Sequence, residues 1–221
     1  YGRANYSLLD RYLFTFTARY DGSSRFSDGN RWGFFPSAAF AWRVKDESFL
    51  KDVKAISDLK LRLGWGKTGQ QDTGKDYYTL TYKKSTSNHY LYPIGGIENN
   101  PGTLFLPLAY NDDLTWETTT TWNVGIDYGM FDQRLTLNLD AYYRKTTDLL
   151  STTTISAGQN FDNALLMNAG TLENKGFEVA ITGRPIQTKD WFVEVGVNAA
   201  YNKNKITELA GGRDMIEAGM Q

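Results

Sequence analysis

A glycine-rich stretch is the first candidate for chemistry in this sequence. Residues 64–69 read Gly-Trp-Gly-Lys-Thr-Gly and match the G-x-G-x-x-G pattern of dinucleotide-binding proteins. Such a site needs a helix directly after the glycines, because the amino terminus of that helix holds the pyrophosphate. Residues 70–75 are polar without an apolar stripe, and a P-loop would need a glycine in place of Leu61. The surrounding sequence therefore argues against a nucleotide site.

The side chains that could bind a metal or transfer a proton are few. His89 is the only histidine and lies in a polar stretch, so we interpret it as an ordinary loop residue. Asp112 and Asp113 directly precede an expected strand, which favours a solvated turn over a calcium-binding pair. The chain contains no cysteine. We predict no catalytic residue, no metal and no cofactor, and we do not expect an enzyme.

Tyrosines are the remaining candidates for contact with a ligand. One polar stretch contains Tyr77, Tyr78, Tyr82, Tyr90 and Tyr92. A loop tyrosine offers a sugar or a peptide a rigid face with a polar tip, but compact loops also pack on their own side chains. Both interpretations stay open, with Tyr77, Tyr90 and Tyr92 as the candidate ligand-binding residues.

Composition indicates strands and turns. The 221 residues include 14 Tyr, 12 Phe, 6 Trp and 21 Gly, and aromatic residues favour strands while glycine favours tight turns. The 24 basic and 25 acidic side chains are spread along the chain, so no surface for nucleic acid is expected. No stretch approaches the roughly 20 apolar residues of a transmembrane helix. The expected class is all-β.

Alternation of apolar and polar residues is the main structural signal. In a strand, successive side chains project to opposite faces, and a membrane barrel strand shows lipid only every second residue. The alternation recurs in eight segments: residues 12–20, 116–128, 135–143 and 191–201, with shorter copies at 4–8, 34–42, 59–65 and 177–181. Several apolar faces begin and end with an aromatic residue, namely Tyr12 with Tyr20, Trp116 with Tyr128, and Trp191 with Tyr201. Such pairs match the apolar band of about 25 Å between the aromatic girdles of a barrel.

The links between these segments alternate in length. Short links fall at residues 10–11, 131–133 and 185–190, and long links at 22–33, 67–113 and 151–171. Outer-membrane barrels have short periplasmic turns and long external loops, so the short links are expected in the periplasm. One periplasmic link, residues 46–56, has apolar residues at helical spacing behind Asp46 as N-cap, which predicts a short helix. The tail, residues 210–221, is expected to lie in an extracellular loop.

Five segments carry a resemblance to a known family. They are Asp-Gly-Ser-Ser-Arg-Phe at 21–26, Arg-Trp-Gly-Phe-Phe-Pro-Ser at 31–37, Ile-Ser-Asp-Leu-Lys-Leu-Arg at 56–62, Leu-Thr-Trp-Glu-Thr-Thr at 114–119 and Asn-Lys-Gly-Phe-Glu at 174–178. In this order they resemble the C-terminal barrel half of the SusC/RagA family. The resemblance runs from about residue 1 to residue 209, and it is least close between residues 72 and 113.

This resemblance implies an antiparallel transmembrane β-barrel of about twenty-two strands, of which the chain would supply eight. It implies an integral protein of the Bacteroidetes outer membrane that imports oligosaccharides or peptides with energy passed through TonB, and a SusD-like surface lipoprotein as lid. Residues 1–209 would be a partial barrel domain without the plug domain that contacts TonB. Asp127, Asn138, Asp140 and Glu194 would line the lumen.

Two other classes of protein remain as alternatives. Eight strands can close a small barrel with a structural or adhesion role, in which case the first and last strands should pair. A soluble glycan-binding β-sandwich would instead bury the face formed by Tyr12, Phe14 and Phe16 against a second sheet. A carbohydrate-active enzyme domain would need paired carboxylates beside a cleft, and none is evident.

Overall fold

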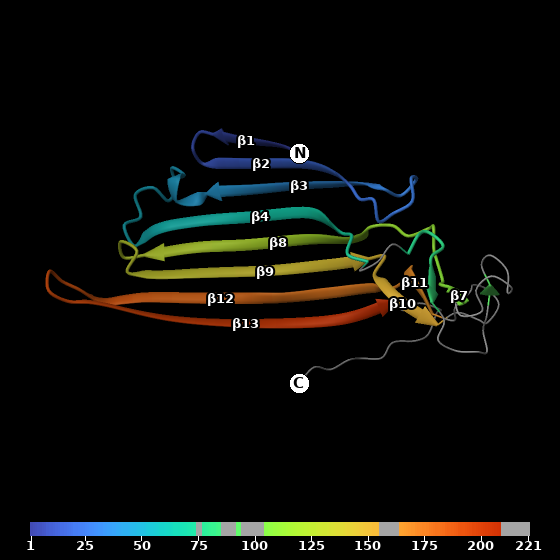
Figure 1. Cartoon of the computed structure of the whole chain (residues 1–221). Coiled ribbons are helices and arrows are strands. Elements are labelled where there is room, and N and C mark those ends of the chain that lie inside the picture. Colours follow the sequence, from blue (N-terminus) through green and yellow to red (C-terminus); the bar gives the residue numbers. More distant parts are fainter. Residues whose placement is uncertain (74–76, 85–91, 94–103, 155–163, 209–221) are drawn as a thin grey trace.

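The computed structural model describes residues 1–73, 77–84, 92–93, 104–154 and 164–208. Its main feature is one antiparallel sheet of eight strands, which lie side by side in a single layer (Figure 1). The strands, in sheet order, are β1 (Gly2–Leu8), β2 (Tyr12–Gly22), β3 (Trp32–Arg43), β4 (Ile56–Gln70), β8 (Glu117–Met130), β9 (Leu135–Thr147), β12 (Thr171–Gln187) and β13 (Phe192–Glu208). The eight predicted strands are confirmed.

The two faces of the sheet differ in polarity, because residues paired across antiparallel strands project to the same side. One row of paired residues, from β4 to β13, is Leu63, Val124, Ala141, Phe177 and Tyr201. The adjacent row, on the other side, is Gly64, Asn123, Tyr142, Gly176 and Asn202. We call these sides the apolar face and the polar face.

The apolar face is open to the surroundings. Phe16, Val124 and Val197 are 54%, 52% and 66% exposed, so no second layer of described residues covers them. Aromatic pairs stand at both ends of this face: Tyr12 stacks on Trp42 at one end, and Tyr20 stacks on Trp32 at the other. The soluble sandwich is therefore not favoured, because it requires this face to be buried.

The sheet is also open at its edges. Among the described residues, β1 pairs only with β2, and β13 pairs only with β12. A complete eight-stranded barrel, which would pair β1 with β13, is therefore not favoured.

The short links are tight turns. Leu9 and Asp10 both have a φ of 53°, as the two central positions of a type I′ hairpin turn require. Three consecutive residues, Phe131 to Gln133, also have positive φ between β8 and β9. The third link is shorter than predicted, because β12 continues through Pro185 with a bulge after Gly183.

The predicted helix over residues 46–56 is wrong. The structure has a 3₁₀ turn, η1 (Val44–Asp46), followed by irregular turns. The Lys45 ammonium donates to the carbonyl oxygens of Leu50, Lys51 and Val53 at 3.0, 3.1 and 2.8 Å. Phe49 and Val53 are 66% and 38% exposed, so two of the apolar residues of the predicted helix pack little, and packing supplies most of a short helix's stability.

Glu47 fastens this link to the strand ends. Its carboxylate accepts hydrogen bonds from the Tyr12 hydroxyl at 2.6 Å and the Trp42 indole at 3.0 Å, and it pairs with the Arg11 guanidinium at 2.8 Å. The hydrogen bonds from Tyr12 and then Trp42, together with the positive charge of Arg11, hold the pKa of Glu47 below its usual value. The hydroxyl of Tyr12 and the indole N–H of Trp42 therefore both have Glu47 as their hydrogen-bond acceptor.

The long links carry small sheets that the sequence pattern did not predict. The link between β4 and β8 contains β5 (Tyr82–Lys84), β6 (Tyr92–Pro93) and β7 (Leu104–Pro107). The link between β9 and β12 contains the hairpin of β10 (Leu150–Thr154) and β11 (Ala164–Asn168). The expected extracellular tail, residues 210–221, lies outside the described residues. No helix in the part of the chain that the structure describes is long and apolar enough to cross a membrane.

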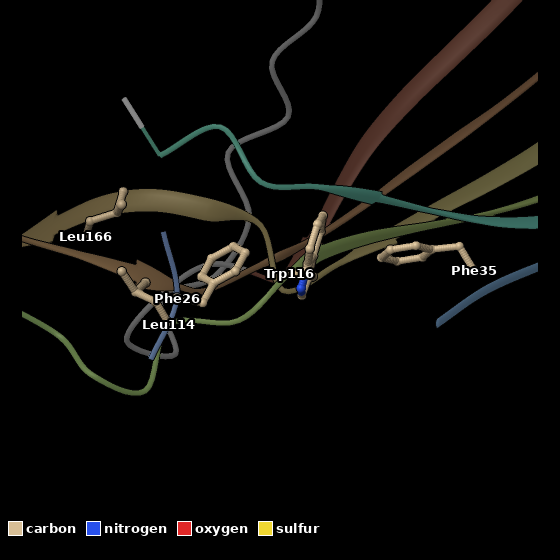
Figure 2. Packing of buried hydrophobic residues seen from close by; sticks show 5 residues of the cluster. All are labelled: Phe26, Phe35, Leu114, Trp116 and Leu166. Carbon is tan, nitrogen blue, oxygen red and sulfur yellow. The ribbon is translucent and has the colours of Figure 1, made fainter. Parts of the chain in front are cut away.

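The buried core lies at the bases of the long links. Phe26, Phe35, Leu114, Trp116 and Leu166 form one cluster, and Figure 2 shows the Trp116 ring between those of Phe26 and Phe35. The ring centroids are 5.4 and 5.2 Å from that of Trp116. The prediction that Trp116 begins the apolar face of a strand is wrong, because β8 starts at Glu117 and the indole turns into this cluster.

Candidate functional site

The polar face of the sheet is the candidate functional site, because it gathers hydrogen-bonding side chains from every long strand. Its centre is a row in which Arg62 of β4, Gly125 of β8, Asp140 of β9 and Glu178 of β12 are paired in turn. One row towards the short links, Lys60, Asp127 and Asn138 pair in the same way. Charged groups of both signs therefore meet in the middle of this face.

Arg62 connects three strands through its guanidinium group. Its Nε donates to both oxygens of Asp127, at 3.1 and 3.0 Å, and its Nη2 donates to Asp127 Oδ1 at 2.8 Å. The same Nη2 reaches Asp140 Oδ2 at 2.9 Å, on a strand that is not adjacent to its own. This forked arrangement suits the planar guanidinium, which a lysine could not replace.

Gly125 makes this crossing possible. A Cβ at this position would lie 2.6 Å from Asp140 Oδ1 and 2.7 Å from Arg62 Cζ. The guanidinium therefore passes directly over the backbone of β8, through space that any other residue would fill. Glycine in the interior of a strand weakens the strand itself, so its presence here indicates close approach of another group.

The charges of this cluster balance. Lys60 lies 3.8 Å from Asp127, so two cations face two carboxylates, and their side chains are between 25% and 33% exposed. Asp127 and Asp140 are each held by the Arg62 guanidinium. No group of described residues has the ligands to hold a metal ion. These paired charges form a fixed polar wall.

Neutral groups extend the polar face towards the long links. The Tyr142 hydroxyl donates to Asn202 Oδ1 at 3.3 Å by crossing Gly176, where a Cβ would lie 2.7 Å from that hydroxyl. Asn174 of β12 donates to Asn204 of β13. These amides and hydroxyls are the donors and acceptors that an uncharged polar ligand can use.

Two hollows open on this face. One, of about 390 Å³, lies over β9, β12 and β13 between Asp140, Glu178 and Asn198. The other, of about 570 Å³, lies nearer the long links and is lined by residues that include Arg3, Arg19 and Gln70. Both are within the size range of small-molecule sites, but they are shallow because the sheet is open.

The bases of the long links are fixed beside this face. The Asn168 amide donates to the carbonyl oxygens of Thr115 and Asp148 at 2.9 Å each, and its oxygen accepts from the Thr115 amide at 2.8 Å. The Ser27 hydroxyl donates to the Asp112 carbonyl oxygen at 2.8 Å. Together with the buried cluster, these bonds hold three long links against one another.

The structure places the predicted lumen residues together. Asp127, Asn138 and Asp140 lie in two adjacent rows of the polar face, and Glu194 pairs with Arg184 at 2.7 Å nearer the short links. Arg62 was not among the predicted residues, although it is the centre of the cluster. Its signal was present, since Lys60 and Arg62 alternate with Leu59, Leu61 and Leu63 along β4.

The three candidate ligand-binding tyrosines lie in different surroundings. Tyr77 is half-buried and packs against the buried cluster, which is the packing role that the sequence left open. Tyr92 lies in β6, and Tyr90 lies outside the described residues. Contact of any of the three with a ligand stays a prediction.

Two of the other motifs lie in the local structure that their sequence context favoured. Residues 64–69 lie inside β4, and the described residues that follow the strand, 71–73, are not helical. Asp112 and Asp113 form an exposed turn, in which the Asn111 side chain accepts from the Asp113 amide. His89 lies outside the described residues.

Comparison with known proteins gives consistent results. Over 222 aligned residues the chain is 50% identical to the TonB-dependent receptor SusC of Bacteroides thetaiotaomicron. The alignment covers 99% of the chain and 22% of that receptor. It is 39% identical to the TonB-dependent receptor P3 of Formosa agariphila, with 98% and 21% covered. The chain therefore spans about a fifth of the length of these relatives.

A solved structure has the same fold. The RagAB peptide importer in its closed-closed state matches with a TM-score of 0.80 at 28% identity, over 98% of this chain and 23% of that one. The resemblance to SusC and RagA is thus confirmed. A family model described as TonB dependent receptor-like, beta-barrel matches residues 1–217. The chain belongs to this family, and its sheet is part of the wall of an integral outer-membrane β-barrel.

Proposed function

We propose that this chain is part of a TonB-dependent importer that carries an oligosaccharide or a peptide across the outer membrane. The observation that carries the proposal is the contrast between the two faces of the sheet. The apolar face, bounded by aromatic pairs, suits lipid, and the polar face suits a hydrated lumen. The identity to SusC and the structural match to a peptide importer support the same conclusion.

The chemistry of the polar face favours an uncharged or zwitterionic substrate. The charges at its centre pair with one another around Arg62, and Tyr142, Asn174 and Asn202 offer neutral donors and acceptors. A substrate would therefore pass a wall that hydrogen-bonds without strong attraction of one sign. Oligosaccharides and peptides both fit this description, so both are proposed as substrate classes.

The remaining parts of the importer are inferred by analogy with its relatives. Residues 1–209 supply barrel wall with external loops, and residues 210–221 continue into an external loop. A plug domain elsewhere in the protein contacts TonB, and a SusD-like surface lipoprotein covers the external opening. Tyr77, Tyr90 and Tyr92 belong to the long link between β4 and β8, which this orientation makes external, and they remain the candidate residues for contact with the substrate.

The experiment uses cells that lack the gene for the full protein. Uptake of labelled oligosaccharides and peptides by these cells should fall for one substrate class, and the intact gene should restore it. Restoration should require TonB, so loss of TonB is the matched control. Unchanged uptake of every polar nutrient in the deleted strain would contradict the proposal.

Purification tests the partner. The full protein extracted from outer membranes in detergent should bring a surface lipoprotein with it in a fixed ratio. Recovery of the protein as a water-soluble species without detergent would contradict the assignment to a membrane wall.

A further inference from the structure

The apolar face carries a group of lysines at one end. The alternation of that face includes four lysines, each two residues from another residue of the face: Lys145 of β9 from Tyr143, Lys175 of β12 from Phe177, Lys203 of β13 from Tyr201, and Lys205 of β13 from Lys203. All four are exposed. We call them the lysine patch.

The strand register places the lysine patch at the level of the aromatic residues. One row of the apolar face consists of Trp65, Trp122, Tyr143, Lys175 and Lys203, paired in turn from β4 to β13. The next row towards the long links consists of Lys67, Thr120, Lys145, Glu173 and Lys205. Aromatic residues of a barrel mark the boundary between the acyl chains and the lipid headgroups. The lysines therefore lie at the headgroup level.

Among the residues that the structure describes, the other end of the apolar face has no such group. Its rows read Leu59, Tyr128, Leu137, Ile181 and Val197, and then Met130, Leu135, Gly183 and Val195. Snorkelling lysines would be expected at both boundaries if they served only to bury their stems in the interface. The concentration at the long-link end therefore needs a cause specific to that side of the membrane.

The lysines are also placed at a cost to the sheet. Lys175 and Lys203 are directly opposite in the register, and like charges in that position destabilise a strand pair. Within the part of the chain that the structure describes, none of the four lies within ion-pair distance of a carboxylate. Two acids are near: Glu173 is the partner of the Tyr143 hydroxyl, and Glu208 accepts from Thr171. The patch thus keeps an excess of positive charge.

We propose that the lysine patch binds the phosphate groups of lipids in the outer leaflet of the outer membrane. Three adjacent strands and two rows span roughly 10 by 7 Å, which matches a phosphorylated headgroup rather than an extended polymer. Lysine binds phosphate as a point charge, and a bound phosphate removes the repulsion between Lys175 and Lys203. The orientation, with the long links outside, rests on the proposed function.

The test measures lipid binding by the full protein, purified in detergent and stripped of lipid. The probe is lipid A with its phosphate groups, and the same lipid A after enzymatic removal of the phosphates is the comparison. Affinity is measured by native mass spectrometry. In the patch variant Lys175→Gln, Lys203→Gln and Lys205→Gln are combined, and the matched control combines Lys51→Gln, Lys54→Gln and Lys189→Gln in the links at the other end.

Each lysine near a membrane surface contributes enough to change affinity roughly fivefold, so the patch variant should bind phosphorylated lipid A roughly a hundredfold more weakly. The single variant Lys203→Gln should lose roughly fivefold, which keeps the test readable if the triple variant is poorly produced. The control variant should bind as the wild-type protein does. Lipid A without phosphates should bind weakly to all of them.

Three results would overturn the inference. Two are equal affinity of the wild-type protein and the patch variant, and equal affinity for the two forms of lipid A. The third is complete displacement of the lipid by millimolar inorganic phosphate, which would assign the site to a free anion. Nutrient uptake by cells carrying the patch variant should stay unchanged, because the patch faces away from the lumen. Failure of the importer proposal would appear in the uptake assay, and the binding measurement would still be readable.

Discussion

At the scale of single residues, Gly125 lies where a side chain would displace the Arg62 guanidinium. In Gly125→Val, the new atoms would displace the Arg62 guanidinium from Asp140. We expect a loss of about 1–2 kcal/mol in the free energy of unfolding, because a charge-assisted hydrogen bond is lost at a partly exposed site. Urea unfolding of the full protein in detergent measures this loss.

Gly64→Ala is the matched control for that variant. Gly64 lies on the same polar face, and a Cβ there would meet only Asn123 Cβ, at an ordinary distance of 3.7 Å. This variant should unfold as the wild-type protein does. Equal stability of both glycine variants would show that the crossing of Arg62 over β8 contributes nothing.

Glu47 makes the stability of the link between β3 and β4 depend on pH. Its folded-state pKa lies below the usual value of 4.5, chiefly because Tyr12 and Trp42 donate hydrogen bonds to the carboxylate. A carboxyl group with a depressed pKa stabilises the fold above its unfolded-state pKa, and this contribution is lost as the pH falls through the folded-state pKa. Glu47→Gln should therefore be less stable than the wild-type protein at neutral pH, and the difference should shrink below about pH 4.5.

This difference in stability is measured by thermal unfolding of both proteins between about pH 3 and about pH 7, in steps of about one pH unit. Asp52→Asn is the control, since Asp52 is exposed in the same link. A constant difference between Glu47→Gln and the wild-type protein over the whole range would contradict the assignment of the charge.

At the scale of elements, the buried cluster is what holds the long links in place. Leu114 is 0% exposed and packs with Phe26 and Trp116, so Leu114→Ala leaves a cavity there. We expect a loss of about 2–5 kcal/mol, confined to the loop bases rather than the sheet. Hydrogen exchange should quicken at residues 23–31 and 164–170 and stay unchanged in β8 and β9. Leu80→Ala, at a site 38% exposed in the same link as Leu114, should leave exchange unchanged, and faster exchange throughout the sheet would refute this local role.

The same elements explain what sequence reasoning could predict. Period-two alternation marks a strand with one apolar face, so all eight long strands were predictable from it. The strands of the long links carry no such pattern, since β10 reads Leu-Ser-Thr-Thr-Thr and β11 reads Ala-Leu-Leu-Met-Asn. The helix over residues 46–56 was predicted from spacing alone, but the capture of three carbonyls by Lys45 is a contact that spacing does not encode.

Prediction of the candidate site was limited by the register. Asp127 and Asp140 were assigned to the polar face from the alternation of side chains, which needs only the sequence of their own strands. Their meeting with Arg62 depends on the pairing of β4 with β8 across a link of more than forty residues, which no local pattern specifies. The burial of Trp116 was missed for the same reason, since its partners Phe26 and Phe35 come from another link.

At the scale of the whole molecule, adjacent positions of one strand should respond in opposite ways to the same substitution. Val124 is on the apolar face and Asn123 on the polar face of β8. Val124→Arg should cost about 2–4 kcal/mol in a lipid bilayer, because the charge meets hydrocarbon, whereas Asn123→Arg should cost far less. Unfolding of the full protein in lipid vesicles measures both, and equal costs would argue against a lipid-facing side.

The most direct test of the two-faced membrane wall is cysteine labelling along β8 in the full protein in native membranes. The chain has no cysteine of its own, so each introduced thiol is read without background from these residues. Val124→Cys and Ile126→Cys should react with a lipid-phase reagent, and Thr121→Cys and Asn123→Cys with a water-soluble one, in strict alternation. Labelling of all four positions by the water-soluble reagent alone would contradict the account.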